Sequence, residues 1–405
     1  MTTMAIDNKD KKVLNVPHLR FPEFSGEWEM VSLQDIATIN PKSDPLQNTF
    51  IYIDLEAVEK GELRKIQEIM REEAPSRAQR VIDNNDILFQ CVRPYQKNNY
   101  IHRILNTSNQ QWVASTGYAQ IRTTELPNYI YHLLNTDEFN RKVMVRCTGS
   151  SYPAINSEDL ATIHLYYTPD KKEQLKISRL LDLLDKRIAT QNKIIEDLKK
   201  LKSAISKHLF ARKDLLETTI CLSNIATLKN DYAFQSGKYN ALGKWKILTI
   251  TNVSGERYIN DEDYNCIINL PNDIQDHQVL KEGDILISLT GNVGRVSLCK
   301  DGDYLLNQRV GLLQLAKNVN QEFLYQILSS QRFENSMIAC GQGAAQMNIG
   351  KGDVESYVLP YSSNVNNILL VAKILHSYDE YIINEQRKLT LLTMQKQYFL
   401  AQMFI

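Results

Sequence analysis

The 405-residue sequence lacks several features that would define a class of protein at once. No apolar run approaches the roughly 18–20 residues of a membrane-spanning helix. The first 13 residues are polar, contain no secretory apolar segment and are interpreted as a flexible tail. The six cysteines include no CxxC pair and the seven histidines form no HExxH cluster. These absences favour a cytoplasmic protein with free thiols and without a metal site.

Recognisable catalytic motifs are also missing. The sequence has no Asn/Asp-Pro-Pro-Tyr/Phe motif of the kind with which methyltransferases hold a target base, and Asn269-Leu-Pro-Asn272 fails as a substitute. The segment 343–352 is a poor phosphate loop, because its spacing is wrong and no Ser or Thr follows Lys351. We therefore expect no catalytic residues and no cofactor, although a dispersed catalytic set leaves no sequence signature.

The chain has 47 basic and 47 acidic residues, so it lacks a net charge. The two kinds of charged residue are nevertheless unevenly distributed along the sequence. Residues 170–213 carry 13 basic and 6 acidic side chains, whereas 1–169 carry 18 and 21, and 214–363 carry 12 and 17. Neutralisation of phosphates supplies most non-specific affinity for DNA. A neutral DNA-binding chain would therefore depend on local basic patches or on basic partners.

An internal repeat is the strongest positive feature. When the sequence is shifted by 194 positions, residues 129–210 align with 323–404 without a gap, and fifteen positions are identical. Shared helical patterning inflates such matches, but eight of the identities lie in 129–169, outside the long helical pattern. The identities include two charged positions, Asp185/Asp379 and Lys202/Lys396.

Two further anchors extend the repeat toward the N-terminus at slightly different offsets. Leu33-x-x-Ile-Ala-Thr matches Leu222-x-x-Ile-Ala-Thr, and Val81-x4-Asp-Ile-Leu matches Val279-x4-Asp-Ile-Leu. Changing offsets indicate insertions between shared strands, as expected when loops vary on a common scaffold. Strand-like runs, Gly/Asn/Asp turns and a helix near 128–145 predict a mixed α/β domain in each copy.

A long helix is predicted after each α/β domain. Asp170 is expected to cap the first helix, with Glu173 at the capping-box position. Neither helical segment contains Pro or Gly, and apolar residues recur at heptad spacing with polar interruptions at Gln191/Glu385 and Lys202/Lys396. The residues expected to pair the helices are Leu181, Leu184, Ile188, Ile195, Leu198, Leu375, Tyr378, Ile382, Leu389 and Leu392.

Because the two narrow seams share their spacing, the simplest partner for each helix is the other. The fold class predicted is α+β: two tandem α/β domains, each followed by a long helix, the helices pairing as an antiparallel coiled coil with internal pseudo-twofold symmetry. Such a pair would be a rod of about 50 Å, longer than one turn of DNA. The alternative is that each helix packs only on its own domain, which normally requires a wider apolar face.

The chain resembles the specificity subunits of type I restriction–modification systems. The resemblance is carried by the segment Pro17–Trp28, by Glu173-Gln174-x-x-Ile177 at the start of the first helix, by the loop Gly149–Asn156, and by the two-fold order of domains. The second copy departs from it, with Asn367-Ile368 in place of Glu-Gln. The resulting domain organisation is a tail at 1–13, target-recognition domains at 14–169 and 214–363, and spacer helices at 170–213 and 364–405.

The resemblance implies a non-catalytic subunit that recognises double-stranded DNA. Such a subunit reads an asymmetric, bipartite sequence, one half per recognition domain, and docks two methyltransferase subunits, whose core recruits restriction subunits. S-adenosylmethionine, ATP and Mg²⁺ are then expected only in the partners. A fused or degenerate nuclease or methyltransferase is one alternative function, and a structural coiled-coil adaptor that never meets DNA is another.

Candidate DNA-reading loops follow the strands that the two copies share. Arg, Asn and Gln can read base edges, Lys neutralises phosphate, and small or hydroxyl residues allow close approach to the backbone. A solvated turn or a helix cap is the alternative for each loop. The first copy offers Arg93, Tyr95, Gln96, Lys97, Asn98, Asn99, Arg146, Thr148, Ser150, Ser151 and Tyr152, and the second offers Thr290, Asn292, Arg295, Gln308, Arg309, Gln342 and Gln346.

The first long helix is itself basic toward its C-terminal half, where Lys199, Lys200, Lys202 and Lys207 gather. Lysines there favour the helix dipole and usually mark a solvated face. Contact with DNA phosphates or with an acidic partner is the other interpretation.

Overall fold

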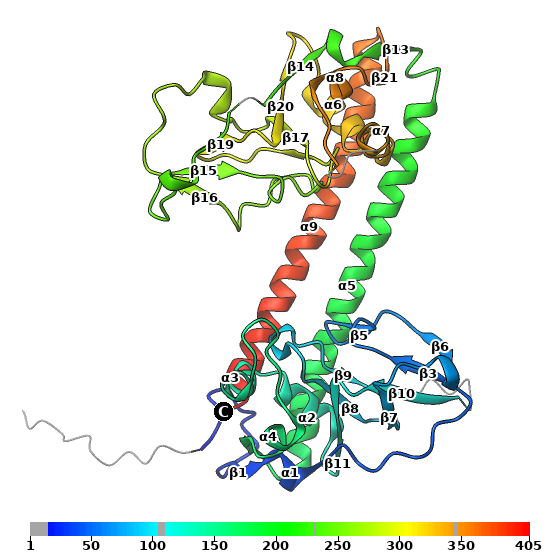
Figure 1. The fold of residues 1–405 in the computed structure, drawn as a ribbon, viewed down its shortest axis with the longest axis vertical. Coiled ribbons are helices and arrows are strands. Elements are labelled where there is room, and N and C mark those ends of the chain that lie inside the picture. The colour runs from blue at the N-terminus through cyan, green and yellow to red at the C-terminus, as the bar shows by residue number, and fades with distance from the viewer. Residues whose placement is uncertain (1–14, 104–109, 231, 343–346) are drawn as a thin grey trace, which may run out of the picture. The chain divides into compact units, whose positions relative to one another are not determined.

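The computed structural model describes residues 15–103, 110–230, 232–342 and 347–405 (Figure 1). Its contacts divide the chain into two units, unit 1 with residues 1–191 and 388–405 and unit 2 with residues 192–387. Each unit therefore contains one α/β head and parts of both long helices. The expected tail at 1–13 lies outside the described residues.

Unit 1 contains three small sheets, with strand orders β6-β3-β10-β7, β2-β11-β8-β9 and β1-β12, and a β4-β5 hairpin. Its strands are β1 (Glu29–Ser32), β2 (Ala37–Ile39), β3 (Thr49–Ile53), β4 (Val58–Glu59), β5 (Glu62–Leu63), β6 (Gln67–Met70), β7 (Ala78–Ile82), β8 (Ile87–Gln90), β9 (Tyr100–Ile101), β10 (Gln111–Ser115), β11 (Tyr118–Thr123) and β12 (His164–Tyr167). Its head helices are α1 (Leu33–Ile36), α2 (Pro127–Leu134), α3 (Asp137–Arg146) and α4 (Ser157–Ala161), with 3₁₀ turns η1 (Arg71–Glu73) and η2 (Pro94–Gln96).

Unit 2 has sheets of order β16-β15-β19, β14-β20-β17-β18 and β13-β21. Its strands are β13 (Thr218–Cys221), β14 (Ala226–Lys229), β15 (Trp245–Leu248), β16 (Asn265–Ile267), β17 (Ile285–Ser288), β18 (Val296–Leu298), β19 (Tyr304–Leu306), β20 (Val310–Leu315) and β21 (Val358–Tyr361). Its head helices are α6 (Gln321–Leu328), α7 (Gln331–Gly341) and α8 (Lys351–Glu355), with 3₁₀ turns η3 (Leu222–Asn224), η4 (Ser236–Lys238) and η5 (Asp276–Gln278).

The two heads share most of their strand topology, which confirms the duplication, although the sheet β6-β3-β10-β7 of unit 1 corresponds to the three strands β16-β15-β19 in unit 2. Each head contains one pair of parallel strands, β3 with β10 in unit 1 and β15 with β19 in unit 2. An antiparallel strand flanks each pair, β6 beside β3 and β16 beside β15. The shared anchor residues also play the same part. Asp86 accepts a hydrogen bond from the backbone N–H of Asp83 before β8, and Asp284 accepts one from Lys281 before β17, at 2.7 and 2.8 Å. Each aspartate thereby forms the turn that starts the central strand of its sheet.

The helices α5 (Lys171–Ala211) and α9 (Val365–Met403) pair antiparallel within each unit. In unit 1, Lys396 of α9 forms an ion pair with Asp185 of α5; in unit 2, Lys202 of α5 forms one with Asp379 of α9, at 2.6 Å. The shift of 194 residues carries each pair onto the other. The lysines that interrupt the apolar seam therefore meet the equivalent aspartate of the opposite helix, and polar pairs of this kind fix register in helix pairs.

The apolar seam packs on the heads as well as on the opposite helix. Leu181 and Leu184 share a core with Met403 and Phe404 from the far end of α9 and with the first head, so α9 does not pack only on its own domain. Likewise, Leu209 of α5 and Leu375 of α9 belong to the core of the second head. Five of the expected pairing residues are buried, Leu181, Leu184, Ile195, Leu375 and Ile382, and five are partly buried, Ile188, Leu198, Tyr378, Leu389 and Leu392.

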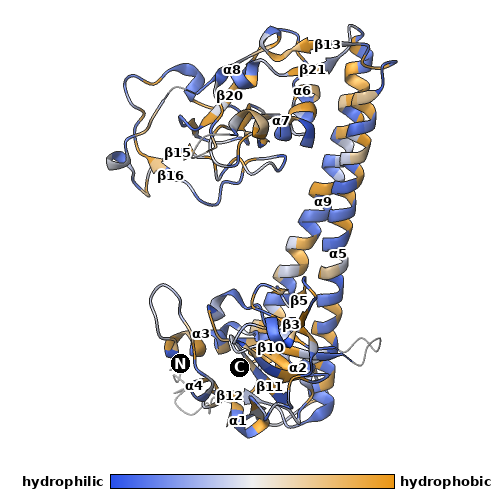
Figure 2. Ribbon diagram, turned by 45° about the vertical axis from the view of Figure 1, so that its right-hand side comes forward, coloured by the Kyte–Doolittle hydropathy of each residue, from blue (hydrophilic) through white to orange (hydrophobic). Residues whose placement is uncertain are grey.

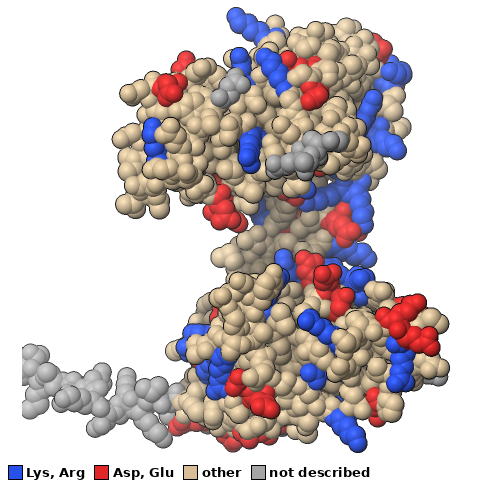
Figure 3. Space-filling view, in the orientation of Figure 1, with Lys and Arg blue, Asp and Glu red and all other residues tan. Residues whose placement is uncertain are grey.

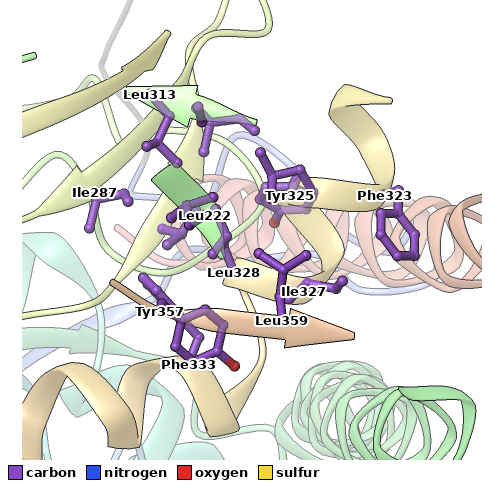
Figure 4. Packing of buried hydrophobic residues seen from close by; sticks show 14 of the residues in the cluster. Leu222, Ile287, Leu313, Phe323, Tyr325, Ile327, Leu328, Phe333, Tyr357 and Leu359 are labelled. Carbon is purple, nitrogen blue, oxygen red and sulfur yellow. The ribbon is translucent and has the colours of Figure 1, made fainter. Parts of the chain in front are cut away.

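Aromatic and branched side chains fill the centre of each head. Figure 4 shows this core in unit 2, where Phe323, Tyr325 and Phe333 from α6 and α7 meet Leu222 and Leu359. Tyr129 and Tyr131 of α2 occupy the corresponding helix in unit 1, and Tyr131 is the repeat equivalent of Tyr325. The core thus fixes the helices and strands from which the variable loops emerge.

Of the two residues expected to cap α5, Asp170 does so and Glu173 does not. Asp170 accepts hydrogen bonds from the N–H groups of Lys172 and Glu173, at 2.8 and 3.4 Å, as an N-cap should. Glu173 does not complete a capping box. Its carboxylate is fully buried and binds the Arg20 guanidinium through two contacts, at 2.7 and 2.9 Å. One bidentate ion pair therefore connects the N-terminal segment Pro17–Trp28 to the start of α5, and the second copy lacks both partners.

His102 makes the stability of unit 1 depend on pH. Its side chain is fully buried beside Trp112, and neither ring nitrogen has a hydrogen-bond partner among the described residues. Burial lowers its pKa to about 4, against a smaller raising effect of Asp86. Because the folded state disfavours the proton, the stabilisation is complete above the ordinary histidine pKa of about 6.5. It is lost as the pH falls from about 6.5 toward 4.

We expect unit 1 to lose about 2 kcal/mol of unfolding free energy between pH 7 and pH 5 through His102. Urea unfolding at the two pH values measures it, and His102→Phe should remove most of the difference. His18→Gln, at an exposed histidine, is the control. An unchanged pH dependence in His102→Phe would contradict the assignment.

Candidate nucleic-acid interface

The two predicted loops of unit 1 lie side by side. The β8–β9 loop and the α3–α4 loop are joined by backbone hydrogen bonds from Arg93 N to Pro153 O, at 2.8 Å, and from Ile155 N to Cys91 O, at 3.0 Å. The Arg93 guanidinium lies 4.4 Å from the centre of the Tyr152 ring, a cation–π contact. Residues far apart in the sequence therefore form one surface, which we call face 1: Arg93, Tyr95, Thr148, Ser150, Ser151 and Tyr152.

Unit 2 repeats the arrangement with other side chains. Gly291 N donates to Met347 O and Ile349 N donates to Leu289 O, both at 2.9 Å, in the positions of the two bonds of unit 1. The β19–β20 turn joins them, because Leu289 N donates to Arg309 O at 3.0 Å. The resulting surface, face 2, is formed by the exposed residues Asn292, Gln308, Arg309, Gln342 and Met347.

The backbone of Arg93 gives independent support for a function of this residue. Arg93 has a φ of 54°, in the left-handed region, while the equivalent position in unit 2 is Gly291 with a φ of 73°. Glycine adopts this conformation without penalty, whereas other residues pay of order 1 kcal/mol. An arginine retained where the loop suits glycine is expected when its side chain has a role.

Several residues predicted to contact DNA instead hold the loops of unit 1 together. Asn99 is buried, accepts from Gln90 N and donates to Asn135. Asn98 accepts from Lys60 N, and the Gln96 amide oxygen accepts from Gln90. These groups are therefore bonded within the head, where they support the loop, and their assignment as base readers stays a prediction.

Two cations of unit 1 are likewise bonded within the head. The Lys97 ammonium pairs with Asp137 at 2.5 Å and also donates to the Asn135 carbonyl. The Arg146 guanidinium donates to the Asp159 carbonyl and the Thr162 hydroxyl, both at 2.7 Å. Lys97 thus fastens the β8–β9 loop to the start of α3, and Arg146 fastens the end of α3 to α4 and the residue that follows it.

In unit 2, the side chains of Thr290 and Arg295 also contact other residues of the same head. Thr290 is buried and its hydroxyl donates to Asn348 at 3.1 Å, so it closes the loop and does not face outward. Arg295 lies 3.7 Å from Glu334. Gln346 lies outside the described residues. Met347 and Asn348 were missed from the sequence, although their position just before Ile349, the equivalent of Ile155, would have indicated them.

One thiol, that of Cys91, is buried beneath face 1. Burial raises the pKa of the Cys91 thiol beneath the loop to about 12, so that it stays protonated at neutral pH and is a poor nucleophile. Within the described ranges, no group of three His, Cys, Asp or Glu side chains is placed to hold a metal ion. No helix in the described part of the chain is both long and apolar enough to span a membrane. On the surface seen in Figure 3, basic and acidic side chains are intermixed on each unit.

Comparison with known proteins agrees with this arrangement. The family described as "Type I restriction modification DNA specificity domain" matches twice, over residues 25–200 and 217–394. The MjaVIII specificity subunit of Methanocaldococcus jannaschii is 25% identical over 370 residues, which cover 81% of this chain and 80% of that protein. The HindI specificity subunit of Haemophilus influenzae is 24% identical over 195 residues, 47% of this chain and 39% of that one.

Solved structures share the fold over nearly the whole chain. The type I S subunit from M. genitalium aligns with a TM-score of 0.57 and 15% identity, over 96% of this chain and 99% of that one. A second solved structure, described as showing complex assembly and conformational transition of the type I R-M system, aligns with a TM-score of 0.56 and 19% identity. The alignment covers 95% of this chain and 98% of that one. The chain belongs to the type I restriction–modification DNA specificity family.

Proposed function

We propose that this chain is the DNA-recognition subunit of a type I restriction–modification complex and reads an asymmetric, two-part site. The observation that carries the proposal is that two equivalent scaffolds present composite surfaces at the same place but with different side chains. Face 1 displays an arginine, two tyrosines and hydroxyl groups, whereas face 2 displays amides and Arg309. Equal scaffolds with unequal readers suit two different half-sites.

The side chains of the two faces match known modes of base and backbone contact. Arg93 can bond the O6 and N7 atoms of a guanine, and Tyr95 and Tyr152, exposed by 50% and 63%, can pack on sugar or base. Thr148, Ser150 and Ser151 suit contacts to phosphate oxygens. On face 2, Asn292, Gln308 and Gln342 are candidate adenine readers, and Arg309 is a candidate guanine reader.

The chain acts, in this proposal, as a scaffold rather than as an enzyme. Methyltransferase and restriction subunits bind to it and supply S-adenosylmethionine, ATP and Mg²⁺ chemistry. The intermixed surface charge supports a need for partners, because few phosphates can be neutralised by this chain alone. Helix α5 connects β12 of the first head to β13 of the second along the chain. We therefore expect this helix to set the length of the unread spacer between the two half-sites.

Single-molecule methylome sequencing tests the function. Cells that lack the chain are expected to lose methylation at one bipartite motif, and an Asn292→Ala, Arg309→Ala variant is expected to relax only one half of that motif. Persistence of the motif without the chain would sink the proposal. Modification or cleavage of DNA by the purified chain alone would favour the alternative, an enzyme, and unchanged specificity in every loop variant would favour a structural adaptor.

A further inference from the structure

Strand β7 carries an arginine, Arg80, close to the base of face 1. Figure 2 shows apolar and polar residues intermixed along the strands of this head, and side chains of a strand point alternately to its two sides. Val81 packs on the side of the sheet where Val113 lies, whereas Ile82 packs with Leu88 of β8 on the other side. Arg80 therefore points to the same side as Ile82, toward β8.

Backbone contacts place the start of β7 beside face 1. The turn between β10 and β11 connects the two, because Thr116 N donates to Arg77 O at 2.8 Å. From the same turn, Gly117 O accepts from Cys91 N at 3.0 Å, and Cys91 opens the β8–β9 loop of face 1. The Arg80 guanidinium is near enough to the Cys91 thiol to interact with it electrostatically. The start of β7 and the base of the loop therefore form one region of unit 1.

The charge of Arg80 has no counterion in the described part of the chain. The half-buried guanidinium forms neither a hydrogen bond nor an ion pair with a described residue, and its Nε atom is buried without a partner. Burial lowers the pKa of Arg80, against a smaller raising effect of the Cys91 thiol. That thiol is neutral at pH 7, because its own pKa is raised to about 12. A half-buried cation without a compensating carboxylate costs free energy while no anion is bound.

The position of Arg80 is occupied by an uncharged residue in the second copy. The anchor that aligns Val81 with Val279 aligns Arg80 with Gln278. Gln278 is buried, and its amide oxygen accepts from Gln275 N at 2.7 Å, so this side chain is satisfied within its own head. The shared scaffold therefore does not require an arginine at this place. The positive charge at position 80 is a property of unit 1.

An arginine nevertheless lies beside the same turn in both heads. Gly117 is the equivalent of Arg309, because its carbonyl accepts from Cys91 N as that of Arg309 accepts from Leu289 N, each at 3.0 Å. Arg309 is exposed and belongs to face 2. Gly117 offers no side chain, and Arg80 supplies a cation to this region from the neighbouring strand. The two heads therefore bring an arginine to equivalent places from different elements.

We propose that Arg80 binds a phosphate of the DNA backbone at the edge of face 1 and thereby holds Arg93 in register with the base that it contacts. The proposal deepens, and rests on, the proposed DNA-reading function. Phosphate contacts fix the position of a protein on a duplex, whereas base contacts carry the sequence information. Arg80 is therefore a positioning residue, and the preference among bases belongs to Arg93 and the other side chains of face 1.

A phosphate suits Arg80 better than a base edge does. A base edge offers hydrogen bonds but no net charge, so a half-buried cation that met one would stay uncompensated. A phosphate oxygen accepts a charge-assisted hydrogen bond and neutralises the guanidinium at the same time. The planar guanidinium also matches the geometry of a phosphate, which two of its N–H groups can contact together. The free energy that the unbound head loses by holding this cation is then recovered on DNA.

The test is the salt dependence of DNA binding by the assembled complex, measured by filter binding between about 50 and 200 mM salt. Arg80→Gln, which introduces the residue of the second copy, should reduce the slope of log K against log salt by about 1. It should weaken binding about tenfold, to a similar extent on duplex DNA with the methylated motif and on unrelated duplex. Arg80→Lys keeps the charge and should keep the slope.

Arg64→Gln is the matched control within the same head. Arg64 is exposed and already pairs with Glu62 at 2.8 Å, so losing its charge should leave the slope unchanged. The unbound chain gives a second measurement, because an arginine with a structural role would stabilise its head. Arg80→Gln should instead leave the unfolding free energy unchanged or raise it, since it removes an uncompensated charge. Urea unfolding measures this difference.

Three results would overturn the inference. An unchanged slope in Arg80→Gln would show that Arg80 contacts no phosphate, and a loss confined to the duplex with the motif would make it a base reader. A clear loss of stability without a change in slope would show a structural role. The proposed function is judged separately, by whether the unaltered complex prefers its methylated motif to unrelated DNA. If that preference holds while the slope stays unchanged in the variant, only the role of Arg80 is removed.

Discussion

Arg20→Ala is expected to lower the unfolding free energy of unit 1 by about 3–5 kcal/mol. Glu173 is fully buried, and Arg20 satisfies it through two contacts, at 2.7 and 2.9 Å. Removing the arginine leaves a carboxylate without its counterion in a place that water does not reach. Arg20 also holds the carbonyls of Ser25 and Gly26, so the N-terminal segment itself would loosen. Chemical denaturation of the full chain measures the loss.

The double variant Arg20→Ala, Glu173→Gln separates the ion pair from the other contacts of Arg20. Gln has nearly the same shape as Glu but no charge to strand, so the double variant should recover much of the loss. Additive effects of the two single changes would show that the pair is not coupled. The segment also packs Trp28 against Phe404, so detachment of the end of α9 should accompany the loss.

Arg93→Gly is expected to weaken binding of the assembled complex to its recognition sequence about 10- to 100-fold, as the loss of one bidentate base contact would. Binding to unrelated DNA should change far less, since Arg93 is assigned to base recognition and not to phosphate. Glycine is the informative replacement because Gly291 already occupies the equivalent position with a positive φ. The loop should therefore keep its shape, and stability should not fall. Filter binding on both DNAs measures the ratio.

Arg146→Ala serves as the matched control for Arg93. Its guanidinium is bound within the head to Asp159 and Thr162, so the replacement should reduce stability without changing which base is preferred. An equal loss of affinity on specific and unrelated DNA in Arg93→Gly would show that Arg93 contacts phosphate. No loss on either would remove face 1 from the interface.

The periodic features of this protein were predictable from its sequence. Helices and shared strands follow from local rules, the heptad seam and the caps, and the repeat doubles the signal from each. The duplication, the two long helices and the equivalence of the 93–99 and 290–295 loops could therefore all be derived. The sequence also shows that Lys202 and Lys396 interrupt the apolar seam. It does not show that each lysine pairs with an aspartate of the opposite helix.

What only the tertiary structure decided concerns polar side chains. In the sequence, Asn99, Lys97 and Arg146 are polar loop residues. A polar side chain that contacts DNA and one that bonds to the rest of its own domain cannot be distinguished from that pattern. Their partners, Gln90, Asp137 and Asp159, come from other elements, and a hydrogen bond between distant elements has no periodicity. The same holds for Glu173, where a local cap was expected and a partner 153 residues away was found. Apolar burial is dictated by spacing along the chain, whereas polar pairing depends on which elements the fold brings together.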